Sequence, residues 1–287
     1  MPFPDAYGIP HNAAIALMAG LLGLLVGSFL NVVIHRLPKM MMRETANFVA
    51  HERGEAQPHT GRYDLLLPRS SCPHCHAALP ARHNIPVLSW LLLRGRCGQC
   101  KAPISVRYPA VELLTAAVFA LAAWKFGAGL TGLAVMACGA FLIALGCIDA
   151  DTMLLPDDLT LPLLWLGLLV NLNHRIAPLQ DAVLGAAAGY AALWLIFWVF
   201  KLATGKEGLG YGDFKLMAAL GAWLGWQALP FVLLSASALG AIVGIALVAA
   251  KRHERGQAIP FGPYLAIAGM LALLYGGNWL SFGIYDY

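Results

Sequence analysis

Residues 13–34 read AAIALMAGLLGLLVGSFLNVVI and contain no charged side chain. A helix needs about 20 mostly apolar residues to cross the hydrocarbon core of a bilayer, so this stretch predicts a membrane-spanning helix. The whole chain has the same character, because 59% of its 287 residues are hydrophobic and only 12% are charged. Soluble domains carry about 25% charged residues. Together with a mean hydropathy of +0.68, this composition excludes the soluble class.

Seven further apolar runs follow the first one. We predict an all-α polytopic membrane protein with about eight transmembrane helices. We expect three domains, which are the first span at residues 1–34, a polar insert at 35–109 and a seven-span membrane domain at 110–287. The predicted spans are residues 13–34, 110–126, 130–148, 159–172, 182–200, 214–226, 229–250 and 259–280.

Basic residues are unevenly distributed over the connections between these spans. Seventeen of the nineteen Lys and Arg residues lie on one predicted side of the membrane, and only Lys125 and Arg175 lie on the other. Cytoplasmic loops carry such an excess of basic residues. We therefore predict that the insert at 35–109 is cytoplasmic and that both termini face the periplasm or the exterior.

Four of the six cysteines form two CxxC pairs within the insert, Cys72 with Cys75 and Cys97 with Cys100. Two such pairs separated by about 20 residues have the spacing of a zinc-ribbon-like structural site. Two disulfides or free thiols are the alternatives, but disulfides are rarely maintained in the cytoplasm. We therefore expect the four thiolates to bind Zn²⁺.

Two acidic residues, Asp149 and Asp213, stand at the predicted cytoplasmic ends of spans. Asp149 closes the third span, and Asp213 follows Gly210-Tyr-Gly and opens the sixth. If these spans pack together, the two carboxylates can share a proton and act as general acid and general base. Ordinary helix-end acids are the competing interpretation, because an acid is favourable at a helix N-terminus. Asp151 also competes with Asp149 on sequence alone.

Five motifs follow one another along the chain: GSFLNVVIHRLP at 27–38, the two CxxC pairs, IDADTMLLPD at 148–157, GYGDFK at 210–215 and IPFGP at 259–263. In sequence and in order they resemble the motifs of the bacterial type IV prepilin peptidases. The resemblance implies an inner-membrane aspartic endopeptidase of the GxGD type, with Asp149 and Asp213 as its catalytic pair. Such enzymes remove the basic leader from type IV prepilins and type II secretion pseudopilins.

The resemblance also implies a second activity, N-methylation of the new N-terminal residue with S-adenosylmethionine as methyl donor. No Rossmann fingerprint is present, so the residues that bind this donor are unassigned. Gly95 is a candidate for this binding site, but a plain turn explains it better. The expected partners are prepilins, pseudopilins and membrane lipid, without nucleic acid. A peptidase without methyltransferase activity and a proton-coupled membrane transporter are the alternatives. The transporter predicts acids near the bilayer midplane and an internal repeat, and the sequence indicates neither.

Overall fold

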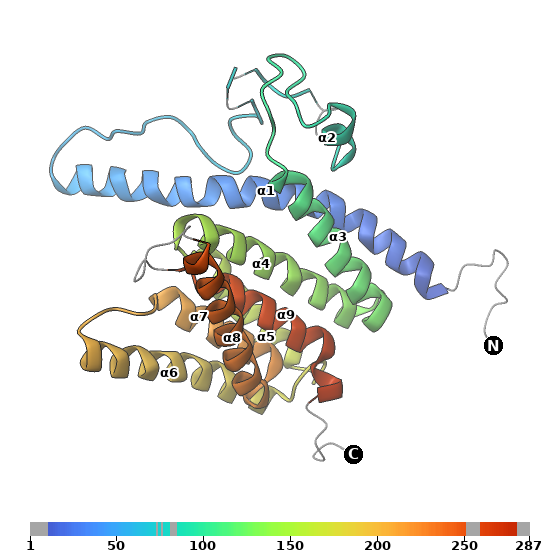
Figure 1. Ribbon diagram of the computed structural model, residues 1–287, viewed down its shortest axis with the longest axis vertical. Coiled ribbons are helices and arrows are strands. Elements are labelled where there is room, and N and C mark those ends of the chain that lie inside the picture. The colour runs from blue at the N-terminus through green and yellow to red at the C-terminus, as the bar shows by residue number, and fades with distance from the viewer. Residues whose placement is uncertain (1–10, 73, 76, 81–84, 251–258, 280–287) are drawn as a thin grey trace. The chain divides into compact units, whose positions relative to one another are not determined.

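The computed structural model describes residues 11–72, 74–75, 77–80, 85–250 and 259–279. The described residues are almost entirely helical (Figure 1), and two isolated bridges are the only extended pairing among them. Every one of the eight predicted apolar runs contains a helix, which confirms the all-α class. The elements are α1 (His11–Glu52), α2 (Leu88–Leu92), α3 (Arg107–Phe126), α4 (Leu130–Thr152), α5 (Asp157–Asn171), α6 (Leu179–Thr204), α7 (Tyr211–Leu224), η2 (Trp226–Ala228), α8 (Leu229–Ala249) and α9 (Gly262–Trp279).

Five of the described helical segments are long and apolar enough to cross a membrane. They are α1, α3, α4, α6 and the continuous segment formed by η2 and α8. α9 carries a shorter apolar stretch, and α5 and α7 have only 15 and 14 residues. The protein is therefore a multi-pass membrane protein, and the count of about eight complete spans stays a prediction.

α1 does not end with the predicted span at residue 34, because it continues to Glu52 and has 42 residues. At a rise of 1.5 Å per residue it is about 63 Å long, roughly twice the thickness of the hydrocarbon core. Pro38 lies inside the helix without ending it. The following segment is rich in Met, Arg, Glu and Ala, which favour helix. α1 is therefore longer than a single membrane crossing requires.

α3 packs against α1 within the compact unit Met1–Ala128. A Cβ atom added at Gly23 would lie 2.7 Å from the Cα of Ala116, and one added at Gly27 would lie 2.7 Å from the Cα of Glu112. Small residues permit this close backbone approach between membrane helices. The order of these contacts shows that α1 and α3 run antiparallel.

The second compact unit, Gly129–Tyr287, is built around α7. α7 packs against α5, α6 and α9, and most of its residues are buried. Its fully buried Trp223 donates its indole N–H to the carbonyl oxygen of Leu163 at 2.9 Å, which ties α7 to α5. A helix buried on all sides is apolar on all sides, so the buried Asp213 in its first turn is an exception that requires a reason.

Candidate catalytic and metal sites

Asp149 lies in the last turn of α4 and is only 4% exposed. Its Oδ2 atom accepts a hydrogen bond of 2.8 Å from the backbone N–H of Gly262. Gly262 is the first residue of α9, so the N–H is one of those that a helix leaves without an internal partner. The start of α9 therefore fixes the orientation of the Asp149 carboxylate and favours its negative charge.

Asp213 lies in the first turn of α7 and is 6% exposed. Its Oδ2 atom accepts a hydrogen bond of 3.0 Å from the backbone N–H of Gly210, which is the reach-back contact of a capping box. Its Oδ1 atom is buried and has no hydrogen-bond partner among the residues that the structure describes. Because a buried oxygen without a partner is costly, this atom is the one available to a shared proton, a water or a substrate.

The chain segment after α4 brings the two acids together. It leads from Asp149 to Leu155, which packs against Gly212, the residue before Asp213. A Cβ atom at Gly212 would lie 2.7 Å from the Cβ of Leu155. The charge of Asp149 also acts electrostatically on Asp213. The two buried carboxylates are therefore neighbours in the structure, although they stand 64 positions apart in the sequence (149 to 213).

The third and sixth predicted spans, α4 and α7, meet in a different way from the direct packing that the sequence suggested. Within the described residues they are not packed along their lengths, and α9 packs against both of them. The acids approach each other at helix ends, where the first residue of α9 binds Asp149. The motif IPFGP at 259–263, which the sequence offered only as a family resemblance, thus has a structural role in holding Asp149.

Other acids near this end of the unit have different surroundings. Asp151 is exposed, in contrast to Asp149 two residues earlier. Asp157 follows Pro156 and lies in the first turn of α5, where an acidic side chain is favourable. Both of its carboxylate oxygens accept bonds of 2.7 Å from the Nζ atom of Lys215. This ion pair links α5 to α7 close to Asp213.

The sequence reasoning missed Gly262 as a residue that orients a catalytic candidate. A signal was present, because a glycine directly before a proline at the start of an apolar run marks a helix N-terminus. The N–H groups of such an end bind anionic groups. The sequence did not reveal that the anionic group would be the carboxylate of Asp149.

The four cysteines of the insert gather at one point. All four Sγ atoms lie within 4.8 Å of one another, and those of Cys72 and Cys100 are 3.8 Å apart. All four are free cysteines, so the two-disulfide alternative is not what the structure contains. Four thiolates bound tetrahedrally to zinc at about 2.3 Å would lie about 3.8 Å from one another. The donor set and its spacing therefore fit one tetrahedral metal ion.

The two CxxC pairs have the same backbone geometry at an offset of 25 positions (72 to 97 and 77 to 102). The N–H of Cys72 donates to the carbonyl oxygen of Ala77 at 3.0 Å, and the N–H of Cys97 donates to that of Ala102 at 2.8 Å. The same offset relates the flanking antiparallel bridges, Ser71 with Ala78 and Arg96 with Pro103. Each pair is thus one copy of a repeated turn that presents two thiols to a shared centre.

These turns also favour the thiolate form that a metal requires. The backbone N–H groups of Cys100 and Gln99 lower the pKa of the Cys97 thiol to about 6. In the other turn, the N–H groups of Cys75 and His74 likewise lower the pKa of Cys72. Because metals bind the thiolate rather than the thiol, one thiol of each pair is prepared for a cation.

Glu112, another buried acid, lies in α3 of the first unit. Its Oε2 atom accepts a bond of 2.7 Å from the N–H of Val87, which has an unusual positive φ of 58° for a β-branched residue. Glu112 therefore ties the segment between the CxxC pairs to α3. Gly95 lies in a turn with φ of 67°, where a Cβ atom would come 2.9 Å from the ring of Trp90, so the turn interpretation holds.

Two family models match this chain, one on each side of residue 130. Residues 21–126 match the family model described as Bacterial Peptidase A24 N-terminal domain. Residues 136–245 match the model described as Type IV leader peptidase family. The second match contains both aspartates, and the first contains all four cysteines of the insert.

Curated relatives match over nearly the whole chain. A prepilin leader peptidase/N-methyltransferase of Aeromonas hydrophila is 57% identical over 263 residues, which cover 90% of each chain. Proteins of the same name from Stutzerimonas stutzeri and Pseudomonas aeruginosa are 53% and 52% identical, and the alignments cover 95–96% of this chain and 95% of theirs. No solved structure matches the chain.

Proposed function

The chain belongs to the type IV leader peptidase family, and from this membership we propose that Asp149 and Asp213 are its catalytic pair. The protein is a membrane enzyme that removes the leader from prepilins and N-methylates the product. The alternative of a proton-coupled transporter has no support, because the family and its relatives are peptidases and methyltransferases.

In the proposed cleavage reaction, one carboxylate of the pair is ionised and the other carries a proton. The ionised group takes a proton from a water molecule, whose oxygen attacks the carbonyl carbon of the scissile peptide bond. The protonated group gives its proton to the carbonyl oxygen, which produces a tetrahedral intermediate. The C–N bond then breaks, the leaving amine takes the proton that came from water, and the new carboxyl group returns a proton to the pair.

The observation that carries this assignment is the buried Oδ1 atom of Asp213, which has no hydrogen-bond partner within the described part of the chain and which lies near the charge of Asp149. Each acid has one oxygen bound by a backbone N–H, from Gly210 or Gly262. These two bonds orient the carboxylates, while the unpartnered oxygen is left for the reaction. Burying a carboxylate oxygen without a hydrogen bond costs stability, and a pair of acids with a purely structural role would have no need of it.

The test compares Asp149→Asn and Asp213→Asn with the control Asp151→Asn. Asp151 is exposed and lies at the same end of α4 as Asp149. Loss of a general acid or base costs about 10²–10⁴-fold in rate, so the first two variants should lose leader removal while the third keeps it. The assay is the mobility shift of a purified prepilin after incubation with each variant. Cleavage near the wild-type rate by either of the first two variants contradicts the assignment.

The methyl transfer is proposed to use S-adenosylmethionine and to depend on the four-cysteine segment. Cys72, Cys75, Cys97 and Cys100 would hold Zn²⁺, which would cross-link the two turns as a closed structural site. Incubating the enzyme with prepilin and labelled S-adenosylmethionine tests the second activity directly. Leader removal without transfer of label would restrict the protein to peptidase activity.

We further propose that the substrates are type IV prepilins and type II secretion pseudopilins, and that the enzyme resides in the bacterial inner membrane. The charge asymmetry supports a cytoplasmic four-cysteine segment, cytoplasmic aspartates and periplasmic termini. Lys201 in the last turn of α6, Lys206 in the connection that follows and Lys215 in α7 support this orientation. Lys251, Arg252 and Arg255, which also contributed to it, lie outside the described residues.

A further inference from the structure

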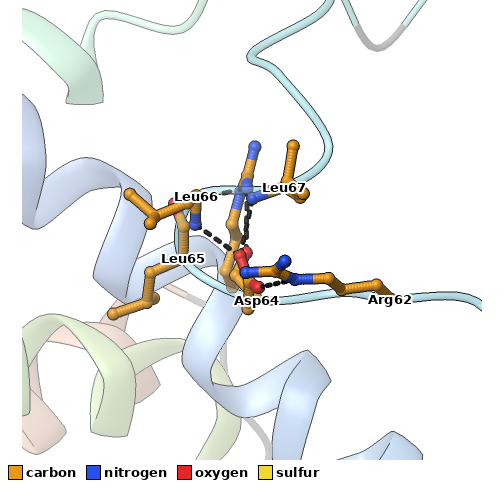
Figure 2. A network of polar contacts seen from close by, with 6 residues as sticks. Arg62, Asp64, Leu65, Leu66 and Leu67 are labelled. Atoms are coloured by element: carbon orange, nitrogen blue, oxygen red, sulfur yellow. Dashed lines mark hydrogen bonds and ion pairs between the residues drawn. The ribbon is translucent and has the colours of Figure 1, made fainter.

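Three consecutive leucines, Leu65, Leu66 and Leu67, lie in a hydrogen-bonded turn of the loop after α1. Leu66 is 74% exposed and Leu67 is 42% exposed. Figure 2 shows the carboxylate of Asp64 bound to the backbone of this turn. Its Oδ1 atom accepts N–H bonds of 2.7 Å from Leu66 and 2.6 Å from Leu67. Leu66 and Leu67 are thus presented outward by a turn in which the N–H groups of both residues are bonded.

The turn keeps its shape across the physiological pH range. The N–H of Leu67, the side chain of Arg62 and the N–H of Leu66 lower the pKa of Asp64 to about 2. The guanidinium of Arg62 lies 2.6 Å from Asp64 Oδ2 (Figure 2). Since the carboxylate remains ionised near pH 7, its hydrogen bonds persist. The exposed leucines are therefore a fixed feature of the surface.

Arg36 attaches this turn to α1. Its guanidinium is buried and donates to the carbonyl oxygens of Asp64 at 2.9 Å and Pro68 at 2.6 Å, with a longer bond of 3.4 Å to Leu65. Arg36 lies only two residues after the predicted end of the first span at residue 34. The 22 residues of that span rise about 33 Å in a helix, close to the thickness of the hydrocarbon core of about 30 Å. With the predicted end of the span at residue 34, the turn is held at the level where α1 would leave the bilayer.

From this placement we propose that residues 65–67 are a membrane anchor that inserts into the boundary between lipid headgroups and acyl chains. Apolar side chains at that depth are buried by lipid. The exposed Arg62 and Arg69 flank the turn on both sides, and cationic residues near the surface are attracted by anionic phospholipid. The partner is thus a lipid surface. The anchor holds the segment that begins at Cys72 against the membrane.

The test places the photoreactive residue benzoylphenylalanine at position 66 of the full-length enzyme in vesicles of phosphatidylethanolamine and phosphatidylglycerol. The matched control is position 61 in the same loop, where a side chain would meet nothing within 4 Å. After illumination, mass spectrometry should detect about tenfold more phospholipid adduct at 66 than at 61, because only an inserted side chain contacts acyl chains. This result does not depend on peptidase or methyltransferase activity.

Two outcomes overturn the proposal. One is equal lipid adduct at both positions, and the other is an adduct at 66 that consists of protein, either this chain or an added prepilin. Arg36→Ala removes the attachment to α1 and should reduce the lipid adduct at 66 severalfold. An undiminished adduct in that variant would refute the role of Arg36, since the turn would then reach the membrane without it.

Discussion

Gly262→Ala is expected to slow cleavage without unfolding the protein. A Cβ atom at this position would lie 2.7 Å from Oδ2, 3.0 Å from Cγ and 3.2 Å from Cβ of Asp149. Ordinary contact begins at about 3.4 Å, so the Asp149 carboxylate must move by about 0.7 Å. A misplacement of about 1 Å can cost 10²-fold in rate. We therefore expect a loss of about 10- to 100-fold, which corresponds to about 1.4–2.7 kcal/mol of transition-state stabilisation.

The fold should tolerate this change, because the Asp149 carboxylate can rotate away from the new methyl group. In addition, alanine favours helix more than glycine does. The assay measures the initial rate of leader removal, together with thermal unfolding in detergent. Gly146→Ala is the matched control at the same α4–α9 contact, where the new Cβ atom would meet Ala266 Cβ at 3.4 Å and Pro263 Cα at 3.5 Å, both in ordinary range. A wild-type rate for Gly262→Ala, or an equal loss in the control, would refute the idea that α9 positions Asp149.

Variants at two further positions address stability. Glu112→Ala removes the acceptor of the Val87 N–H and should lower the free energy of unfolding by about 1–3 kcal/mol. Glu112→Gln keeps an acceptor and should cost less. Equal melting temperatures for both variants and wild type would contradict a stabilising role for the hydrogen bond between Glu112 and Val87. Lys215→Ala breaks the ion pair with Asp157, but both side chains are partly exposed, so the loss should be below about 1 kcal/mol. A larger loss of stability in thermal unfolding would contradict the small contribution expected of an exposed ion pair.

The sequence predicted where helices occur much better than where α1 ends. Apolar runs set the eight helical ranges because lipid requires backbone polar groups to bond within each segment. The extension of α1 past Pro38 left no comparable signal, since its outer half is polar and a proline usually ends a helix. Whether the 14 residues of α7 span the membrane also cannot be read from their hydropathy, because α7 is covered by other helices.

The candidate site was predictable in its residues but not in its assembly. Spacing identified the four cysteines, because two thiols on one turn already form half of a tetrahedral site. Asp149 and Asp213 were identifiable as acids at the ends of apolar runs. Their meeting depends on long-range contacts between the start of α9 and the end of α4. No periodicity in the sequence encodes such a contact.

The proposed catalytic pair and the four-cysteine segment lie in different compact parts of the chain, and this separation predicts the effect of zinc removal. The groups that orient the aspartates, including Gly210 and Gly262, lie within Gly129–Tyr287, and the four thiols lie within Met1–Ala128. Cys72→Ser, or treatment with a chelator, should therefore lower the zinc content and the methylation while leader removal is retained. Zinc measured by elemental analysis, label transfer and cleavage would be followed on the same preparation. Parallel loss of cleavage and zinc would mean that the four-cysteine segment is needed by the aspartate pair as well.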